Sequence, residues 1–276
     1  MFDRHFYKKA NEIRDPLTGT ENMAPFLYYM IRSIRPQNVL EYGMGYSTIF
    51  MLKALSDNIK AYEKEKKSIL KKKANFPTPI SLEDFKSFFL DKEAPLYDPE
   101  YYLKPYSPQL ICFEKLPKSH EYTQNILKVV DDLNLGYLLT LIEGDACTQS
   151  EKIPSSFLPL DFVWNDDDSY YHFFKTYWGL LNNVNAHLLI HSTEGTGSLN
   201  LLEMEKIRQN LKNEENESNY EFMSILEPHK LHQRSFTIIR KKGNKEQIHL
   251  DIPNHQTRVY ENFLVLKEKH KLSKRE

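Results

Sequence analysis

The sequence predicts an α/β protein built on a doubly wound, mostly parallel sheet of seven strands with helices on both faces. Three observations predict this class. Short apolar runs alternate with segments of helical periodicity, a glycine turn joins the first strand to a helix, and a polar residue follows most of the strands. A chain of 276 residues with 40% hydrophobic content is long enough to bury the core of such a domain.

Residues 38–48 contain the strand end, glycine turn and helix start around which the chain is organised. The two glycines let the backbone approach a ligand closely, and the start of the helix presents free N–H groups. The third glycine of the dinucleotide fingerprint is missing, because Thr48 takes its place, and this favours a ligand without a pyrophosphate. The residues that this turn offers to a ligand are Glu41, Gly43, Gly45 and Ser47.

The segments on either side of this turn are less regular. Residues 1–22 are polar with a weak helical pattern, and we expect an N-terminal tail that packs loosely. Residues 23–34 have the apolar spacing of a helix, and the helix after the turn is expected to end near Leu55. Residues 56–108 then form an ordered insertion, either a lid or an interface, because prolines and tyrosines are frequent at 76–108 but apolar anchors remain. Within it, the charged residues 60–73 are expected to form a solvated helix.

The alternation of strands and helices resumes after the insertion. Four further strands are predicted at 110–113, 137–142, 160–164 and 186–190, followed by a strand pair at 222–226 and 235–240. Helical patterns that connect strands are found at 122–133, 170–181 and 199–213. The main domain therefore covers residues 23–240, and residues 241–276 are a C-terminal extension.

A polar side chain follows each of these strands. In a parallel sheet the carboxyl ends of the strands meet at one edge, where ligands bind. One such residue alone is ordinarily a solvated loop group, but its repetition after successive buried strands favours a shared ligand site. The residues are Glu41, Glu114, Asp145, Asp166 and His191, with Glu227 and His229 after the sixth strand.

The composition restricts which binding partners and which cellular compartment we expect for the protein. The chain has 37 Lys and Arg against 38 Asp and Glu, a net charge of −1, so nothing favours bulk attraction to nucleic acid or to an anionic membrane. Cys112 and Cys147 fall at strand positions and are expected to be buried thiols rather than a disulfide. No apolar signal region opens the chain and no stretch is long enough to span a bilayer, which predicts a cytoplasmic protein.

The motifs at the strand ends, in this order and spacing, resemble those of the class I S-adenosylmethionine-dependent methyltransferases over residues 23–240. The stretch Asn-Val-Leu-Glu-Tyr-Gly-Met-Gly-Tyr-Ser is similar to the first motif of that family, and Asp-Phe-Val-Trp-Asn-Asp at 161–166 to the fourth. The resemblance implies a Rossmann-like fold, S-adenosyl-L-methionine as cofactor, and methyl transfer to an O or N atom of a small-molecule acceptor. The insertion at 56–108 departs from the family, since it separates the first two strands further than usual.

The resemblance also implies which residues contact the cofactor. The glycine loop approaches the methionine part, and Glu41 holds its amino group through the loop. Glu114 accepts hydrogen bonds from the ribose hydroxyls, and Asp145 takes the adenine amino group. The cofactor-binding set is therefore Glu41, Gly43, Gly45, Ser47, Glu114, Asp145, Ala146 and Asp166.

Methyl transfer of this kind requires a base, because an oxygen nucleophile or a protonated amine must lose a proton. His191 is the first candidate, since an unperturbed histidine titrates near neutral pH. Asp166 can orient that histidine or bind a cationic amine directly, and His229 is a second candidate base.

The residues after the fifth strand argue against an obligatory metal ion. In the metal-dependent catechol-type relatives, the fourth strand ends in an Asp and the fifth in an Asp-Asn pair, which bind magnesium. Here His191-Ser192-Thr193 replaces that pair, and hydroxyl groups are poor magnesium ligands compared with carboxylates. A softer transition-metal site remains as an alternative, with the ligands Asp166, Asp168, His191 and His229.

Two other functions stay open from the sequence. An aminopropyl-type transferase on the same fold has an Asp-rich fourth-strand signature, which Asp166-Asp167-Asp168-Ser169 resembles, although the matching pattern elsewhere is missing. A non-enzymatic cofactor- or partner-binding protein is the other alternative, against which the intact set of strand-end acids argues. For the enzyme we expect a small-molecule acceptor and no nucleic-acid or membrane partner, and an aromatic insertion is compatible with a homodimer.

Overall fold

The computed structural model describes residues 2–74, 101–102, 104–167, 169–194, 198–214 and 219–242. The chain divides into two compact units. The first unit, residues 1–62 and 105–244, contains the seven strands described below. The second unit, residues 63–104 and 245–276, is described only at 63–74, 101–102 and 104, and within it the Tyr102 hydroxyl donates to Glu65 Oε2 at 2.9 Å.

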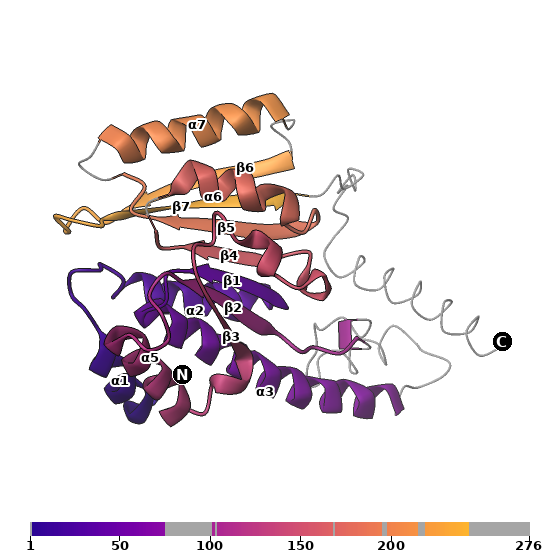
Figure 1. Cartoon of the computed structure of the whole chain (residues 1–276). Coiled ribbons are helices and arrows are strands. Elements are labelled where there is room, and N and C mark those ends of the chain that lie inside the picture. Colours follow the sequence, from indigo (N-terminus) through magenta and orange to yellow (C-terminus); the bar gives the residue numbers. More distant parts are fainter. Residues whose placement is uncertain are drawn as a thin grey trace. The chain divides into compact units, whose positions relative to one another are not determined.

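Seven strands form one sheet in the order β3-β2-β1-β4-β5-β7-β6 (Figure 1). The first five strands along the chain pair in parallel, whereas β7 runs antiparallel to both of its neighbours, β5 and β6. The predicted mostly parallel, seven-stranded sheet is confirmed. The strands are β1 (Asn38–Tyr42), β2 (Gln109–Glu114), β3 (Leu139–Glu143), β4 (Phe162–Asn165), β5 (Asn185–His191), β6 (Tyr220–Leu226) and β7 (Ser235–Lys242).

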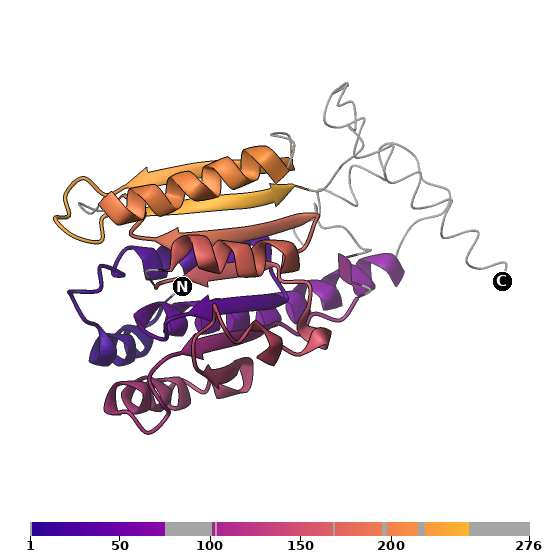
Figure 2. The ribbon, with the colours of Figure 1, turned by 45° about the horizontal axis from the view of Figure 1, so that its top comes forward.

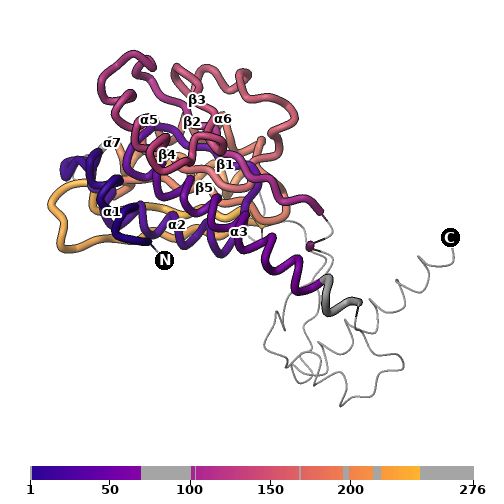
Figure 3. The backbone as a smooth tube through the Cα atoms, turned by 90° about the horizontal axis from the view of Figure 1, so that it is seen from below, coloured from indigo at the N-terminus to yellow at the C-terminus, as the bar shows by residue number. Residues whose placement is uncertain are grey.

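Helices cover both faces of the sheet, as the sequence predicts (Figure 2). One face packs against α1 (Arg4–Ala10), α2 (Met23–Ile34), the first part of α3 (Tyr46–Ala74) and α5 (Glu121–Asp132). The other face packs against α6 (Tyr170–Tyr177) and α7 (Ser198–Glu214). Figure 3, which views the backbone from below, shows α1, α2 and α3 together on the first of these sides.

The central strands are buried on both sides. In β1, Val39 belongs to the core cluster beneath α2 and α3, and Leu40 to the cluster beneath α6 and α7. Successive side chains of a strand point to opposite faces, so a strand covered on both faces reads as a continuous apolar run. The same alternation places Glu41, two residues after Val39, on the face covered by α2 and α3.

The N-terminal segment corrects one expectation. Residues 1–22 were expected to pack loosely, but Phe6 and Ala10 of α1 are 2% and 0% exposed. The helix is capped by Asp3, whose Oδ1 accepts from the Phe6 N–H at 2.7 Å. The Phe6 ring also meets Phe50 of α3 with centroids 5.0 Å apart. The helical pattern of this segment therefore marks a packed element and not a loose tail.

The helix after the glycine turn is longer than expected. It was expected to end near Leu55 and to be followed by a separate solvated helix at 60–73. Residues 60–73 are helical as predicted, but they continue α3, which runs without interruption to Ala74. Residues 60–73 are rich in Lys and Glu, which are good helix formers even where no apolar stripe is needed. Most of the predicted insertion, residues 75–100 and 103, and the predicted extension beyond Lys242 lie outside the described residues. The domain boundaries therefore stay predictions.

Candidate functional site

The carboxyl ends of the parallel strands share one edge of the sheet, called the carboxyl edge below. Register pairs Glu41 of β1 with Trp164 of β4. Glu114, the last residue of β2, pairs with Glu143 of β3. His191 is the last residue of β5. The polar residues that end the strands in the sequence therefore meet at this edge, as the topology predicts.

The glycine turn after β1 is held closely between its neighbouring strands. Gly43 has a φ of +92°, in the left-handed region that favours glycine, and a Cβ atom there would lie 3.3 Å from the Asp166 carbonyl oxygen. The Gly43 N–H donates to the Phe113 carbonyl at 3.0 Å. The Gly45 N–H donates to Thr48 Oγ1 at 2.8 Å, so that threonine caps the start of α3. The turn thus requires glycine at position 43.

Glu41 is fully buried beneath this turn. Its Oε1 accepts a hydrogen bond from Ser47 Oγ at 2.6 Å, so Ser47 contacts the strand and does not cap the helix. Burial raises the pKa of Glu41 to about 8, although the hydrogen bond from Ser47 acts in the opposite direction. A carboxyl group with this pKa is mostly protonated at neutral pH.

Replacement of Glu41 by Gln is expected to stabilise the protein increasingly as the pH rises from 5 to 8. The folded chain holds a proton on Glu41 up to about pH 8, whereas an ordinary Glu has lost it above 4.5. Because the folded state binds more protons than the unfolded state in this range, the free energy of unfolding of the wild type falls as the pH rises. Urea unfolding at several pH values should show the variant gaining at most about 1.4 kcal/mol per pH unit relative to the wild type. Glu143→Gln, which alters an exposed strand-end carboxylate, is the control, and parallel stability curves for Glu41→Gln would contradict the expectation.

Glu114 ties the glycine turn to the end of β2. Its Oε2 accepts from the Met44 N–H at 2.8 Å, and its Oε1 accepts from the Leu116 N–H at 2.8 Å. The side chain is nearly buried, at 7% exposure. Each carboxylate oxygen has a second lone pair, so the group can still accept hydrogen bonds from two neighbouring hydroxyls of a ligand.

Asp145 lies at the end of β3 in a second cluster of polar groups. Its Oδ1 accepts from the Tyr42 hydroxyl at 2.9 Å and from the Cys147 N–H at 2.8 Å. Burial acts to raise the pKa of Asp145, but these two hydrogen bonds outweigh it and hold the pKa below its usual value. The neighbouring Ala146 is buried, and its carbonyl accepts from the Tyr177 hydroxyl at 2.8 Å. Asp145 is therefore an ionised acceptor with a fixed orientation.

Two residues of this cluster, Tyr42 and Lys115, are not among those predicted from the sequence. The Lys115 ammonium lies 5.1 Å from the centre of the Tyr42 ring and forms an ion pair with Asp167 at 2.8 Å. Tyr42 directly follows Glu41, and Lys115 directly follows Glu114. Their positions next to the strand-end acids were the only signal, since neither residue type is diagnostic alone.

Asp166 and His191 form a hydrogen-bonded pair across the ends of β4 and β5. Asp166 Oδ1 lies 2.7 Å from His191 Nδ1. The His191 side chain is 2% exposed, whereas that of Asp166 is 21% exposed. Of the pair, Asp166 is therefore the group that a molecule at the carboxyl edge can reach.

His229 is not part of the pair formed by Asp166 and His191. It occupies the turn between β6 and β7, is exposed, and forms no hydrogen bond or ion pair with any residue that the structure describes. The adjacent Lys230 is held firmly, because its Nζ contacts Glu21 at 2.8 Å and Glu227 at 2.7 Å. Asn22 also donates to Glu227, at 2.5 Å. Glu227 thus fastens the N-terminal segment to this turn, and His229 is outside the pair formed by Asp166 and His191.

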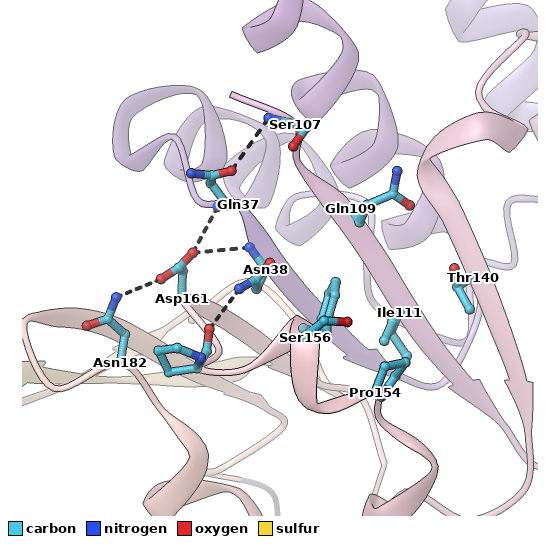
Figure 4. A pocket seen from close by; sticks show the side chains of 12 residues that line it. Gln37, Asn38, Ser107, Gln109, Ile111, Thr140, Pro154, Ser156, Asp161 and Asn182 are labelled. Atoms are coloured by element: carbon cyan, nitrogen blue, oxygen red, sulfur yellow. Dashed lines mark hydrogen bonds between the residues drawn. The ribbon is translucent and has the colours of Figure 1, made fainter. Parts of the chain in front are cut away.

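A cavity of about 580 Å³ lies at the opposite end of the sheet (Figure 4). Its lining includes Asn38 at the start of β1, Gln109 at the start of β2, and Asp161, which directly precedes β4. The Asp161 carboxylate is already used, because it accepts from the Gln37 and Asn38 N–H groups at 2.9 and 3.1 Å and from the Asn182 amide at 2.9 Å. The hydrogen bonds of Asp161 join the segments at this end of the sheet. The lining of the cavity includes none of the strand-end acids.

Two features are absent from the described ranges of the chain. No three His, Cys, Asp or Glu side chains in those ranges are grouped so that they could hold a metal ion. Among the same residues, no helix has both the length and the apolar character needed to cross a membrane.

No protein-family model and no curated protein matches the sequence. Solved structures do match the fold. The O-methyltransferase TomG from Streptomyces achromogenes, involved in tomaymycin synthesis and solved with SAM, is 14% identical, with a TM-score of 0.56 over 88% of this chain and 92% of that one. An O-methyltransferase from Klebsiella pneumoniae whose activity is inferred is 12% identical, with a TM-score of 0.53 over 88% and 92%.

A third solved structure shows the same likeness. The SAH-bound methyltransferase PaMTH1 from Podospora anserina is 14% identical, with a TM-score of 0.52 over 87% of this chain and 89% of that one. At these identities the likeness concerns the fold. The chain thus has the Rossmann-like fold of S-adenosylmethionine-dependent methyltransferases, as the sequence predicts.

Proposed function

We propose that the protein is an S-adenosyl-L-methionine-dependent methyltransferase that transfers a methyl group to an O or N atom of a small molecule. The observation that carries this proposal is the carboxyl edge itself. Hydrogen bonds fix Glu41 and Glu114 at the glycine turn, and the Tyr42 hydroxyl, directly before the turn, fixes Asp145. A positive sulfonium with ribose hydroxyls and an amine suits such an acid-rich, phosphate-free edge. The fold shared with structures that contain SAM or SAH supports the same conclusion.

The cofactor would be held by the residues around the turn. Gly43 and Gly45 allow close approach of the backbone, while Ser47 holds Glu41 at the base of the turn. The free lone pairs of Glu114 suit the ribose hydroxyls. Asp145 and Ala146 suit the adenine end, since Asp145 Oδ2 accepts no hydrogen bond from the residues described. When bound, the cofactor supplies an electrophilic methyl group.

Asp166 is the group that we assign to the acceptor. Catalysis of in-line transfer depends mainly on holding the nucleophile close and aligned, and a carboxylate can do this while it takes or shares the proton of the nucleophile. The sequence suggested that Asp166 orients His191. The exposures of 21% and 2% favour the reverse, in which His191 orients Asp166. His229 is assigned no step.

We propose that the reaction needs no metal ion. A hard divalent cation prefers several oxygen ligands. The end of β5 supplies an imidazole whose Nδ1 faces the Asp166 carboxylate at 2.7 Å, together with the Ser192 hydroxyl. This donor set does not match magnesium. From the sequence we retain a small-molecule acceptor, a cytoplasmic location and the absence of nucleic-acid or membrane partners as parts of the proposal.

Calorimetric titration with S-adenosylmethionine, S-adenosylhomocysteine and NAD tests the proposal. We expect one-to-one micromolar binding of the first two and none of NAD, because the turn lacks the third glycine of the dinucleotide fingerprint. Incubation with candidate acceptors should then release S-adenosylhomocysteine. Release of methylthioadenosine would instead indicate aminopropyl transfer, and lack of binding would favour a non-enzymatic role.

A further inference from the structure

Three buried polar atoms on one face of the sheet have no hydrogen-bonding partner among the described residues. They are Glu41 Oε2, Trp164 Nε1 and His191 Nε2. The three residues are 0%, 0% and 2% exposed. Buried polar atoms in folded proteins are nearly always paired, either with protein groups or with enclosed water, so each of these atoms needs an explanation.

The three side chains are neighbours on adjacent strands. Glu41 pairs in register with Trp164, and Trp164 pairs with Leu189, two residues before His191. Residues in register share a face of the sheet, and so do residues two apart on a strand. The rings of Trp164 and His191 confirm this, because their centroids are 5.5 Å apart.

The hydrogen-bonding capacities of the three atoms are complementary to one small polar molecule. A carboxylate can only accept, so His191 Nδ1 carries the hydrogen in its 2.7 Å contact with Asp166, which leaves Nε2 as an acceptor. Trp164 Nε1 can only donate. Glu41 is mostly protonated at neutral pH, so Oε2 can donate as well. A single water molecule can accept from Glu41 and Trp164 and donate to His191.

Two side chains lie near the Glu41 carboxyl, but neither makes a hydrogen bond with Oε2. Thr48 and Cys112 lie close enough to lower the pKa of the Glu41 carboxyl. The Thr48 hydroxyl oxygen, however, accepts from the Gly45 N–H at 2.8 Å, and the Cys112 thiol lies 3.8 Å from the Phe113 carbonyl.

The end of β5 is also held in an unusual conformation. Ser192, directly after His191, has a φ of +57°, which is uncommon for a residue with a side chain. Its N–H donates to the Ser235 carbonyl at 2.6 Å, and its carbonyl accepts from the Asn200 amide at 3.0 Å. Such backbone persists only where surrounding contacts impose it, and here it fixes the direction in which His191 leaves the strand.

We propose that Glu41, Trp164 and His191 enclose a binding site for one water molecule, which completes a chain of hydrogen bonds from Ser47 at the glycine turn to Asp166. The order of the chain is Ser47, Glu41, water, His191 and Asp166. Ser47 and Glu41 adjoin the turn to which we assign the cofactor, and Asp166 is the group that we assign to the acceptor. The water site makes His191 a positioning residue for Asp166. Only this last consequence depends on the proposed function.

The tautomer of His191 tests the water site without cofactor or substrate. In nitrogen-15 NMR spectra of the full chain at neutral pH, we expect Nδ1 of His191 to be protonated and Nε2 to be bare but hydrogen-bonded. Trp164→Phe removes the indole donor together with part of the ring, so it should shift the His191 Nε2 resonance towards that of a nitrogen without a hydrogen bond. Trp178→Phe is the matched control, because Trp178 packs against Phe174 in the cluster on the other face of the sheet. A proton on Nε2, or the same response to both substitutions, would overturn the proposal.

A crystal structure of the wild type gives a second test that needs no variant. One water peak should lie within hydrogen-bonding distance of all three atoms. A direct contact between two of them, or of Glu41 Oε2 with Thr48 or Cys112, would exclude the site. Neither test requires S-adenosylmethionine to bind, so failure of the water site and failure of the proposed methyltransferase function are distinguishable.

Discussion

Replacement of Asp166 by Asn is expected to lower kcat about 100-fold or more, the usual range for loss of a general base. The Asn carbonyl oxygen can still accept the hydrogen bond from His191 Nδ1, so the fold and the buried pair should survive. What disappears is the negative charge and the ability to take a proton from the acceptor. Steady-state assays that follow formation of S-adenosylhomocysteine should therefore show a large fall in kcat and a much smaller change in cofactor affinity.

Asp167→Asn provides the control for Asp166→Asn. This neighbouring carboxylate forms an ion pair with Lys115, with an O–N distance of 2.8 Å and a lysine side chain that is 47% exposed. Exposed pairs of this kind contribute little to stability. We expect turnover close to that of the wild type for Asp167→Asn. Equal turnover in both variants would remove Asp166 from the chemistry, and a comparable fall in both would mean that the general charge of the edge matters more than one base.

The fold could be predicted because buried parallel strands have a simple sequence pattern. Strands covered on both faces, such as β1 and β5, read as short apolar runs, and the helices between them have a different period. Once the sheet is parallel, the residues after each strand must meet at one edge. That step brought Glu41, Glu114 and Asp166 together without any knowledge of their contacts.

The predictions were wrong in segments where the apolar pattern does not follow the bounds of the helix. The regular apolar spacing stops near Leu55 although α3 continues to Ala74, since beyond that point buried residues such as Tyr62 and Ile69 are widely spaced among charged ones. In the N-terminal segment the pattern is short, and Phe6 and Ala10 are buried by contacts with residues distant in the sequence. The local signal for a helix start in this segment is Asp3, a residue type common at N-caps, directly before α1.

The details of the site depended on side-chain contacts between distant residues. The pairing of Asp166 with His191 was expected as a possibility, but its direction follows from burial, which the sequence does not contain. The part played by Trp164 follows from register with Glu41 and from the fact that an indole N–H needs an acceptor. Tyr42 can be assigned to the site only from its hydrogen bond to Asp145. Lys115 can be assigned only from its ion pair with Asp167.

Replacement of Glu114 by Ala is expected to weaken the binding of S-adenosylmethionine by about 5-fold to more than 100-fold. The substitution removes the acceptor of the Met44 and Leu116 N–H groups, and with it the group that we assign to the ribose. Loss of a buried hydrogen-bonding partner costs about 1–3 kcal/mol, and about 1.4 kcal/mol corresponds to tenfold in affinity. The glycine turn also loses its tie to β2, so the variant should have a lower free energy of unfolding even without cofactor.

Two further variants separate these effects of Glu114. Glu114→Gln keeps one carbonyl oxygen and the length of the side chain, so it should retain the fold better than Ala while still losing affinity, because a neutral amide accepts hydrogen bonds less strongly than a carboxylate. Glu143→Ala changes the register partner of Glu114 on β3, which is exposed, and should bind the cofactor like the wild type. Calorimetry on the three variants compares them directly. If Glu114→Ala folds and binds as tightly as Glu143→Ala, the cofactor does not lie against β2, and the assignment of the carboxyl edge as its site is wrong.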